Sequence, residues 1–436
     1  MPMKQAINIV KKHCTRAYNI TQFDKNNNKE TPTKQTNMEK EIFEQPQSVR
    51  RAMLGRVNFE NKRVFLNEIS KHTDDILRCK RLIVIGAGSS YHVAIGTRQI
   101  MEELVELPVF VESASDFLDR EVPVFRNDVC IFISQSGETS SVIQACQYCR
   151  KRDALTMCVT NNSHSTLSSI TDFTLDIHSG KEYGVTSTKT YTGQFLTMVL
   201  FAMHLASDKR TKVQRIHEII KELEFLPEKI EKVLTCSSQL RELSKCMLDQ
   251  ESILLMGRGY QQSSSLEGSL KMKEVTNIHS EGIHSGELKH GPLALIDEQI
   301  PIIMIIMRDA VFDKCMNALQ QVQARNGRPV LICESDDNEV ANMSDQLIKV
   351  PKTIDCLAAI LTVIPLQMLS LYMALHKNKN VDRPKGLVKT VIDYKAPAQK
   401  TCKSFIQTLF NSGTQFSVPY HLKARESAAR LTTIKT

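Results

Sequence analysis

The sequence has 436 residues, of which 42% are hydrophobic and 24% are charged, and it carries a net charge of +8. By length it can form two or three domains with substantial hydrophobic cores. The positive charge lies at the two ends, because residues 1–37 and 392–436 each hold seven basic and two acidic side chains, whereas the residues between them have a net charge of −2. The body of the chain therefore lacks the basic excess of a nucleic-acid-binding protein, and we expect no nucleic-acid partner.

Cysteine usage and hydropathy argue against two further classes of protein. The twelve cysteines show no disulfide framework, and Cys146-x-x-Cys149 has no second pair that would complete a zinc site. We therefore expect a reducing compartment, the cytoplasm. The longest apolar runs are residues 302–307 and the stretch 358–371, which Pro365 interrupts. Both are shorter than a membrane span, so we expect no transmembrane helix and no membrane partner.

The first segment of the chain, residues 1–40, is predicted to be a polar and disordered tail. Its residues 24–30 (DKNNNKE) are all polar and offer nothing to a hydrophobic core. Four basic side chains precede the first acidic residue, Asp24, which leaves a mitochondrial presequence as an alternative.

The first strong strand pattern is residues 81–86, which end in Gly86-Ala-Gly88. A strand followed by Gly-x-Gly occurs in dinucleotide-binding folds, where a third glycine allows the helix to pack closely on the strand. Tyr91 occupies the place of that third glycine. We therefore expect no nicotinamide cofactor, and no other cofactor is predicted.

A second strand pattern, residues 129–133, runs into a hydroxyl-rich turn, residues 134–139 (SQSGET), and then into a helical pattern. The N–H groups at a helix N-terminus are free and carry a partial positive charge, so they can bind an anion together with nearby hydroxyl groups. The same residue types also form simple helix caps. Two interpretations follow, a cradle for a small phosphorylated ligand and a capping turn.

An internal duplication organises the chain. Residues 81–88 and 252–259 are both apolar runs that end in Gly-x-Gly, 171 residues apart, and residues 129–133 match residues 300–304 at the same offset. Short apolar runs that alternate with helical patterns build a parallel sheet covered on both faces. We predict an α/β fold of two tandem doubly wound parallel-sheet domains. At this offset the residues in place of the three hydroxyl residues of the turn are Ile305, Met307 and Ala310, so only the first copy is predicted to bind phosphate.

Residues 267–295 are unusually rich in ionisable side chains. Lys271 and Glu274 stand three residues apart, so a helix puts them on one face, where a carboxylate can move a proton beside a positive charge. A surface ion pair is the alternative. A metal site could be suggested by three histidines with nearby glutamates, His279, His284 and His290, but the spacing matches no zinc motif, and no metal is predicted.

Four motifs, in consistent order, resemble one family. They are Ser134-Gln-Ser-Gly-Glu-Thr139, Gly184-Val-Thr-Ser-Thr-Lys189, Glu287-Leu-Lys-His-Gly-Pro-Leu-Ala-Leu295 and Asp382-Arg-Pro-x-x-Leu-x-Lys389. From about Met38 to Val391 the chain is similar to the isomerase half of glutamine–fructose-6-phosphate aminotransferase (isomerizing). The resemblance implies two SIS (sugar isomerase) domains with flavodoxin-like sheets. It also implies that fructose 6-phosphate is converted to glucosamine 6-phosphate, the entry step of hexosamine and UDP-GlcNAc biosynthesis.

The resemblance also assigns roles to the residues at matching positions. The matches to the family's phosphate ligands are Ser134, Gln135, Ser136 and Thr139, and the matches to positions that contact the sugar are Ser90, Val185 and Ser187. Lys389 matches the lysine that forms a Schiff base with C2 of the ketose. Glu274 matches the base that moves a proton between C1 and C2, and Lys271 matches an assisting lysine. His290 matches the residue that opens the furanose ring and reaches the active site of the neighbouring subunit, so a homodimer is implied.

Three features depart from the family. The family enzyme begins with a glutaminase domain whose nucleophile is a cysteine exposed by removal of the initiator Met, whereas residue 2 here is Pro. We therefore do not expect glutamine hydrolysis, and the predicted nitrogen source is ammonia, free or from a separate glutaminase. Gly86-Ala-Gly-Ser stands where the family has Ala-Cys-Gly-Thr. In the family the matching lysine lies a few residues from the carboxyl terminus, whereas 47 residues follow Lys389 here. This extension could displace Lys389 or could hang free.

Three functions remain open from the sequence. The first is an isomerase and aminotransferase module for fructose 6-phosphate. The second is a non-catalytic sugar-phosphate-binding subunit, alone or paired with a full-length paralogue. The third is a glucosamine-6-phosphate deaminase-like enzyme. The predicted organisation is a tail (1–40), a first SIS domain with the cradle (41–215), a second SIS domain (216–380), a segment that closes the active site (381–391) and a basic extension (392–436).

Overall fold

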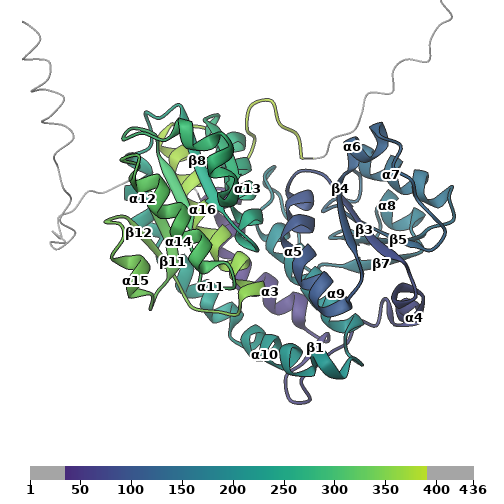
Figure 1. The fold of residues 1–436 in the computed structure, drawn as a ribbon. Coiled ribbons are helices and arrows are strands. Elements are labelled where there is room, and N and C mark those ends of the chain that lie inside the picture. Colours follow the sequence, from purple (N-terminus) through teal and green to yellow (C-terminus); the bar gives the residue numbers. More distant parts are fainter. Residues whose placement is uncertain (1–34, 390–436) are drawn as a thin grey trace, which may run out of the picture.

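A computed structural model of the protein describes residues 35–389, which form two lobes that lie side by side (Figure 1). The first lobe is built on a five-stranded sheet with the strand order β4-β3-β5-β6-β7, and the second on a five-stranded sheet with the order β12-β11-β10-β8-β9. The predicted extension 392–436 and most of the predicted tail 1–40 lie outside the described residues. Residues 37–40 open the first described helix, α2 (Asn37–Phe43).

In the first lobe all neighbouring strands are parallel, and helices connect them. The strands are β3 (Arg81–Gly86), β4 (Val109–Ser113), β5 (Asp128–Ile133), β6 (Leu155–Thr160) and β7 (Phe173–Asp176). The helices are α5 (Ser89–Val105), α6 (Ala114–Asp119), α7 (Ser140–Arg150), α8 (Thr166–Ile170) and α9 (Lys189–Leu205). Every residue of β5 is buried, which fits a central parallel strand covered on both faces.

The second lobe repeats this arrangement with parallel strands. Its strands are β8 (Ser252–Gly257), β9 (His279–His284), β10 (Ile302–Ile305), β11 (Val330–Glu334) and β12 (Leu347–Val350). Its helices are α13 (Gln261–Lys271), the π-helix η3 (Met272–Thr276), the 3-10 turns η4 (Ser285–His290) and η5 (Pro292–Leu295), α14 (Phe312–Gln323), α15 (Asn338–Ala341) and α16 (Asp355–His376). Counted along the chain, both sheets have the strand order 2-1-3-4-5, which is the flavodoxin-like order. The predicted fold class is confirmed.

The sheet register corrects the predicted match between the two copies. Ile83 pairs with Cys130 in the first sheet, and Leu254 pairs with Ile302 in the second. Leu254 follows Ile83 by 171 residues, whereas Ile302 follows Cys130 by 172, so the match slips by one residue at the third strand. The residues at the positions of the three hydroxyl residues are therefore Ile306, Arg308 and Val311 rather than Ile305, Met307 and Ala310. None of them carries a hydroxyl group.

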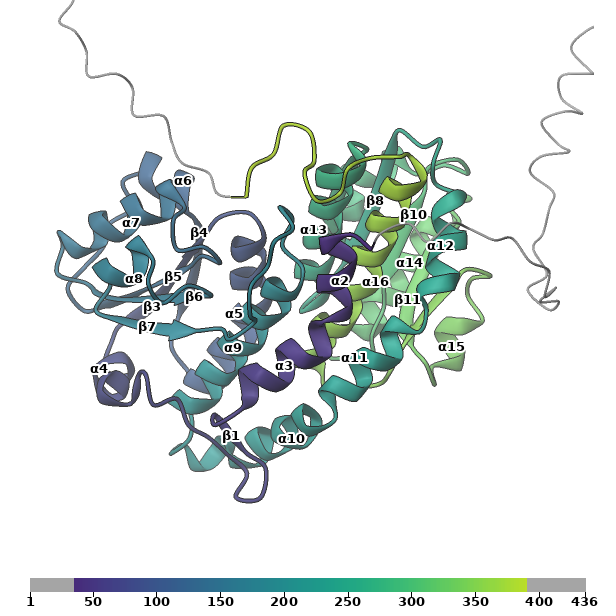
Figure 2. The ribbon, with the colours of Figure 1, turned by 180° about the vertical axis from the view of Figure 1, so that it is seen from behind.

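The remaining elements surround the two sheets. They are α3 (Gln45–Met53), the short hairpin β1 (Val57–Asn58) and β2 (Arg63–Val64), η1 (Ser70–His72), α4 (Thr73–Leu77), η2 (Arg210–Lys212), α10 (Val213–Glu224), α11 (Leu226–Leu234) and α12 (Ser237–Lys245). Figure 2 shows α2 and α3 running across the back of the molecule from one lobe to the other. The helix α3 packs on α9 of the first lobe and on α11, while α2 packs on α16 of the second lobe.

The helix α16 runs through the core of the second lobe without a break at Pro365. It is long and apolar enough to cross a membrane, but its most apolar window is entirely buried inside the protein, as in a core helix. Pro365 lacks the N–H that an α-helix would use, yet tertiary packing keeps the helix continuous. The buried Gln367 accepts a hydrogen bond from Gln45 Nε2 at 3.0 Å and donates one to the Thr188 carbonyl at 3.4 Å, which joins α16 to α3 and to the start of α9.

The two lobes meet through α5 and α13, which pack against each other. Gly96 of α5 makes this approach possible, because a Cβ atom there would lie 2.4 Å from Ser263 Oγ and 2.6 Å from Phe195 Cε2. Ser263 lies on α13 and Phe195 on α9, so one missing side chain lets three helices come together.

We expect Gly96→Ala to destabilise the protein by about 1–3 kcal/mol, because the added methyl group overpacks the contact between the lobes. Thermal or urea unfolding measures the change. Arg98→Ala, at an exposed position of the same helix, is the matched control and should change stability by less than about 0.5 kcal/mol. Equal stability of the two variants would contradict this account of the lobe contact.

Candidate active site

The predicted cradle lies where β5 ends and α7 begins, at the carboxyl edge of the first sheet. Ser134 Oγ lies 3.1 Å from Thr139 Oγ1 and accepts a hydrogen bond from the Gly137 N–H at 3.2 Å. Ser136 Oγ accepts one from the Glu138 N–H at 3.2 Å. The hydroxyl groups therefore gather around a single tight turn.

The capping alternative fits the turn less well than the cradle. Thr139 occupies the N-cap position of α7, but its side chain makes no capping hydrogen bond. The first-turn N–H groups of α7 are thus left without a side-chain cap, as an anion site at a helix N-terminus requires. Gly137 has φ +67°, and a Cβ atom there would lie 2.0 Å from Ser165 Oγ, so the turn depends on glycine.

A neighbouring loop, residues 177–188, is tied to this cradle through Asn161. The Asn161 N–H donates to the Gln135 carbonyl at 3.1 Å. Its side chain accepts from the Ser179 N–H at 3.1 Å and donates to the Gly180 carbonyl at 2.7 Å. The carboxyl ends of β5, β6 and β7 are therefore held together at one edge of the sheet, as expected for a parallel α/β fold.

The loop 177–188 carries two predicted sugar contacts, Val185 and Ser187, and it receives Lys389. Lys389 Nζ donates to Glu182 Oε2 at 2.8 Å and to the Gly184 carbonyl at 2.5 Å. Ser187 Oγ lies 2.8 Å from Thr190 Oγ1 at the start of α9. The structure thus brings Lys389, Val185 and Ser187 together.

Ser90 lies in the first turn of α5, directly after the Gly86-x-Gly88 turn. Its side chain is buried, and Ser90 Oγ donates to Gln194 Oε1 of α9 at 3.2 Å. The Gln194 Nε2 group is buried without a hydrogen-bond partner among the described residues. Ser90 therefore points to the same α5–α9 side of the first lobe on which the loop 177–188 enters α9.

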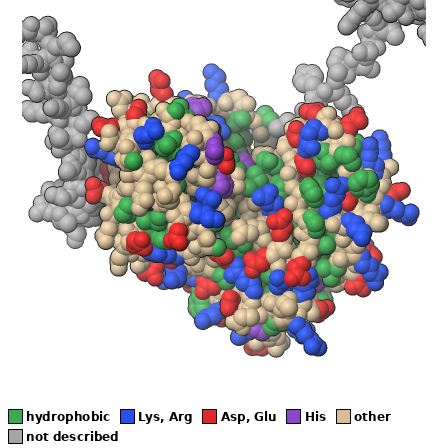
Figure 3. Space-filling model, viewed as in Figure 1, with side chains coloured by type: hydrophobic (Ala, Val, Ile, Leu, Met, Phe, Trp, Pro, Cys, Tyr) green, Lys and Arg blue, Asp and Glu red, His purple; other side chains and the backbone are tan. Residues whose placement is uncertain are grey.

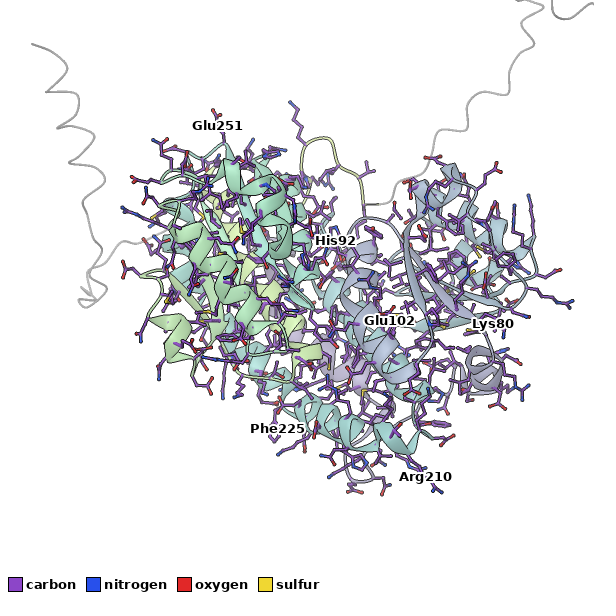
Figure 4. The ribbon with its side chains drawn as sticks, viewed as in Figure 1. Lys80, His92, Glu102, Arg210, Phe225 and Glu251 are labelled. Atoms are coloured by element: carbon purple, nitrogen blue, oxygen red, sulfur yellow. The ribbon has the colours of Figure 1, made fainter. Side chains whose placement is uncertain are left out.

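Lys271 and Glu274 form part of a buried charge cluster between the lobes, not a surface ion pair. Lys271 Nζ lies 2.6 Å from Glu274 Oε2 and 3.1 Å from Glu267 Oε1, and the side chains of Lys271 and Glu267 are fully buried. From the first lobe, Ser89 Oγ donates to Glu267 Oε1 at 2.8 Å, and His92 Nδ1 lies 2.8 Å from Glu267 Oε2. Figure 4 shows His92 between the two lobes.

The electrostatics of this cluster separate the roles of its two carboxylates. Burial by itself disfavours both charges, but Lys271 and His92 hold the pKa of Glu267 below its usual range. Burial raises the pKa of Glu274, and Lys271 offsets this only in part. Burial alone would lower the pKa of Lys271, yet the two carboxylates outweigh it and raise that pKa. An ion pair between Lys271 and Glu267 thus stands beside a carboxyl group, that of Glu274, whose pKa is raised.

Local backbone geometry helps to place Glu274. The helix α13 ends at Lys271 and continues as the π-helix η3, which contains Glu274 and stops at Asn277 with φ +57°. A π-turn adds one residue to a helical turn and is common at functional sites.

The predicted ring-opening residue, His290, lies apart from these groups. It is exposed at the end of η4, and within residues 35–389 its side chain makes no hydrogen bond or ion pair. Figure 3 shows histidine side chains on the face of the second lobe beside the hollow between the lobes. The turn η4, which ends at His290, packs on α14 and β9 of the second lobe, whereas the cradle belongs to the first lobe.

Two cavities lie within residues 35–389, and the larger of the two lies far from the predicted site residues. A cavity of about 620 Å³ lies at the amino ends of β5 and β6, opposite the cradle, and Asp128 and Leu155 line it. A second cavity of about 440 Å³ lies between the lobes, beside Gly88, His92 and Lys273. Among residues 35–389 no cluster of His, Cys, Asp or Glu could hold a metal ion.

Several residues of the site were not predicted from the sequence. Glu267, His92 and Ser89 complete the buried cluster, while Glu182 binds Lys389 and Gln194 binds Ser90. The spacing of Glu267 and Lys271, four residues apart in a helical pattern, is a signal that could have indicated the first pair. The other contacts join residues more than 100 positions apart, so no local sequence pattern indicates them.

Comparison with known proteins supports this assignment of the fold. The SIS domain family model matches residues 75–204 and 247–377. Glutamine–fructose-6-phosphate aminotransferase (isomerizing) 2 from Homo sapiens is 53% identical over 354 residues, and the enzyme from Saccharomyces cerevisiae is 46% identical over 359 residues. Each match covers 81% of this chain, and 52% and 50% of the relative. The chain thus spans about half the length of the curated relatives it matches.

Solved structures show the same correspondence. The C-terminal domain of glucosamine-fructose-6-phosphate aminotransferase from Francisella tularensis superposes with a TM-score of 0.76 at 30% identity, covering 80% of this chain and 99% of that domain. Glucosamine-6-phosphate deaminase from Thermotoga maritima superposes with a TM-score of 0.65 at 20% identity, over 82% of this chain and all of that one. The second likeness concerns the fold alone.

We expect Glu267→Gln to destabilise the protein by about 3–5 kcal/mol, because it leaves the buried Lys271 without one of its two carboxylate partners. Urea unfolding measures the loss. The matched control is Glu106→Gln, which removes a carboxylate paired with Lys209 and Lys212 at the surface and should change stability little, because water screens exposed ion pairs. A loss in Glu267→Gln no larger than that of the control would contradict the inferred role of the cluster.

The stability of the protein should also depend on pH through Glu41. Burial and the neighbouring Glu182 raise the pKa of Glu41 from 4.5 to about 7, against the lowering effects of the Tyr183 and Gly184 N–H groups and of Lys389. The stabilising contribution of this group is full below about pH 4.5 and is lost as the pH rises through about 7.

The variant Glu41→Gln, which cannot ionise, should therefore become more stable relative to the wild type as the pH rises from about 5 to about 8. Melting temperatures of both proteins across this range provide the measurement. Other groups titrate in both proteins, so the difference between them isolates Glu41. A difference that stays constant over the range would show that Glu41 does not titrate there.

Proposed function

Because this chain belongs to the SIS-domain family and matches the isomerase half of glutamine–fructose-6-phosphate aminotransferase, we propose that it converts fructose 6-phosphate and ammonia to glucosamine 6-phosphate. The observation that carries the proposal is the buried Lys271–Glu274 pair, which adjoins the α5 turn that also bears Ser90. The nitrogen donor in this proposal is ammonia, free or from a separate glutaminase. We assign no role in glutamine hydrolysis to any of residues 35–389.

Binding of the substrate begins at the phosphate group. The hydroxyl groups of Ser134, Ser136 and Thr139 and the free N–H groups of α7 supply hydrogen-bond donors and a partial positive charge. Gln135 joins this set from the same turn. Ser90, Val185 and Ser187 then contact the sugar.

Covalent chemistry starts once the furanose ring is open. His290 of a second copy of this chain opens the ring in the proposed homodimer, which fits its exposed position without a side-chain partner among residues 35–389. The neutral amine of Lys389 attacks C2, a C2–N bond forms, and the C2 oxygen leaves as water. Ammonia then displaces the lysine nitrogen from C2, which regenerates the free amine.

Glu274 completes the reaction by moving a proton from C1 to C2. Its raised pKa makes its carboxylate a stronger base, which favours accepting the proton from C1 before it is returned to C2. Removal of the C1 proton leaves negative charge on the sugar, and the Lys271 ammonium, 2.6 Å from Glu274, lies close enough to stabilise that charge. The aldose that results carries the amino group on C2, as glucosamine 6-phosphate does.

We expect Glu274→Gln to lower kcat for glucosamine 6-phosphate formation by about 10²–10⁴-fold, because the variant cannot move the proton. Ser134→Ala should instead weaken fructose 6-phosphate binding by about 10–100-fold, because it removes a hydrogen bond to a charged group. Product formation is measured with and without ammonium. Ser169→Ala, at an exposed serine outside the cradle, is the control and should leave both values unchanged.

Three outcomes contradict the proposal. Saturable binding of fructose 6-phosphate without any turnover in the wild type would favour the sugar-phosphate-binding subunit. Ammonia release from glucosamine 6-phosphate, with no detectable synthesis, would favour the deaminase. Turnover that survives Glu274→Gln would remove this residue from the mechanism.

A further inference from the structure

The segment that follows α16, residues 377–389, crosses from the second lobe to the first, and we name it the strap (Figure 1). Its far end is Lys389, which is bound in the loop 177–188 of the first lobe. Most of the strap is exposed, and Leu387 and Val388 are 41% and 66% exposed, so hydrophobic packing does little to fix its end. Polar contacts must therefore fix the position of Lys389.

One fixed point of the strap is Asp382. Its two carboxylate oxygens accept hydrogen bonds from the N–H groups of Asn37 at 2.9 Å and Met38 at 3.0 Å. These N–H groups lie in the first turn of α2, where a carboxylate is favoured by the free donors and by the helix dipole. The strap is therefore attached to α2 seven residues before Lys389.

A second carboxylate, that of Glu41, attaches the receiving loop to the same helix. Glu41 lies within α2, its side chain is buried, and it accepts hydrogen bonds from the N–H groups of Tyr183 and Gly184. Gly184 is also the residue whose carbonyl accepts from Lys389 Nζ. The strap that carries Lys389 and the loop that receives it are therefore both hydrogen-bonded to α2.

The carboxylate that binds the lysine is itself fixed by α9. Glu182 Oε1 accepts hydrogen bonds from the N–H groups of Thr188 at 3.0 Å and Thr190 at 3.2 Å, at the N-terminus of α9. Its other oxygen accepts from Thr190 Oγ1 at 2.7 Å as well as from Lys389. A buried carboxylate with this many donors cannot follow a moving lysine, so the lysine must be brought to it.

We propose that α2 positions the lysine of the reaction, with Asp382 fixing the strap and Glu41 fixing the loop that carries Glu182, so that Lys389 is held at the edge of the cradle. This inference rests on the proposed function, in which Lys389 attacks C2 of the sugar. Asp382, Glu41 and Glu182 are positioning residues, since none of them is assigned a contact with the substrate. The lysine leaves Glu182 only when the sugar arrives.

The size of the effect depends on what else holds the strap. Val381, directly before Asp382, is 1% exposed and packs in the hydrophobic core, and Pro384 is also buried, so loss of the Asp382 contact leaves the start of the strap in place. The local concentration of a tethered group falls roughly as the −3/2 power of the tether length, so the small change in free length by itself alters the rate little. The main loss is the orientation of the strap toward Glu182, which the two hydrogen bonds of Asp382 set.

Borohydride trapping tests the proposal on the full chain. The protein is mixed with fructose 6-phosphate, the C2=N bond of the Schiff base is reduced by hydride from borohydride, and mass spectrometry measures the adduct at Lys389. We expect Asp382→Ala to lower the rate of adduct formation by about 3–10-fold while the affinity for fructose 6-phosphate stays unchanged, and Asp382→Asn, which can still accept one hydrogen bond, to restore part of the rate. Lys385→Ala, an exposed strap residue, is the control and should trap at the wild-type rate.

A second variant keeps the hydrogen bonds of Asp382 and changes only the length of the chain that follows. Four glycines inserted after Gly386, which is exposed and has φ +82°, lengthen the chain between Asp382 and Lys389 and should slow trapping by a similar factor. Equal trapping rates in the wild type, Asp382→Ala and the insertion variant would overturn the positioning role of α2 alone. A wild type that binds the sugar but never forms the adduct at Lys389 would instead overturn the proposed function.

Discussion

The buried charge of Lys271 is the constraint on which the contact between the lobes depends. An ammonium group without water needs opposite charges and hydrogen-bond acceptors around it, and here Glu267, Glu274 and Ser89 supply them. Both carboxylates lie in the same lobe as Lys271, whereas Ser89 comes from the first lobe, so the full set of acceptors forms only when α5 and α13 pack together. The requirement that holds the lobes in place therefore also sets the proton-transfer group beside the first sheet.

The duplicated architecture has diverged so that each copy supplies a different part of the site. The first sheet keeps hydroxyl groups and free helix N–H groups at its carboxyl edge, whereas the matching loop of the second sheet holds Arg308 in ion pairs with Asp337 and Glu339. An arginine already neutralised in this way offers little to a phosphate. The second copy instead contributes Lys271 and Glu274 through the helix after its first strand. In the proposed function the first sheet binds the substrate and the second supplies the groups that act on it.

Local patterns were enough to predict both sheets, because buried parallel strands are short apolar runs and the Gly-x-Gly turns mark where they end. The same patterns located the cradle turn and the Lys271–Glu274 pair. They failed where distant residues decide the outcome. Asp382 reaches a helix more than 340 positions earlier in the chain, and Pro365 sits inside an unbroken helix because surrounding residues pack against it. The sequence also did not indicate the one-residue shift in register, because the offset between β3 and β8 cannot show that one residue is inserted before β10.

The π-helix at Met272–Thr276 has a consequence for how this protein can change during evolution. A π-turn carries one residue more than the α-helical turn it replaces, and its hydrogen bonds are weaker, so deletion of a single residue would give a more regular helix. The same deletion would rotate every later residue of the helix by about 100° about its axis, given 3.6 residues per turn, and carry Glu274 away from Lys271. Under the proposed role of Glu274, selection for stability and selection for chemistry therefore oppose each other at this turn.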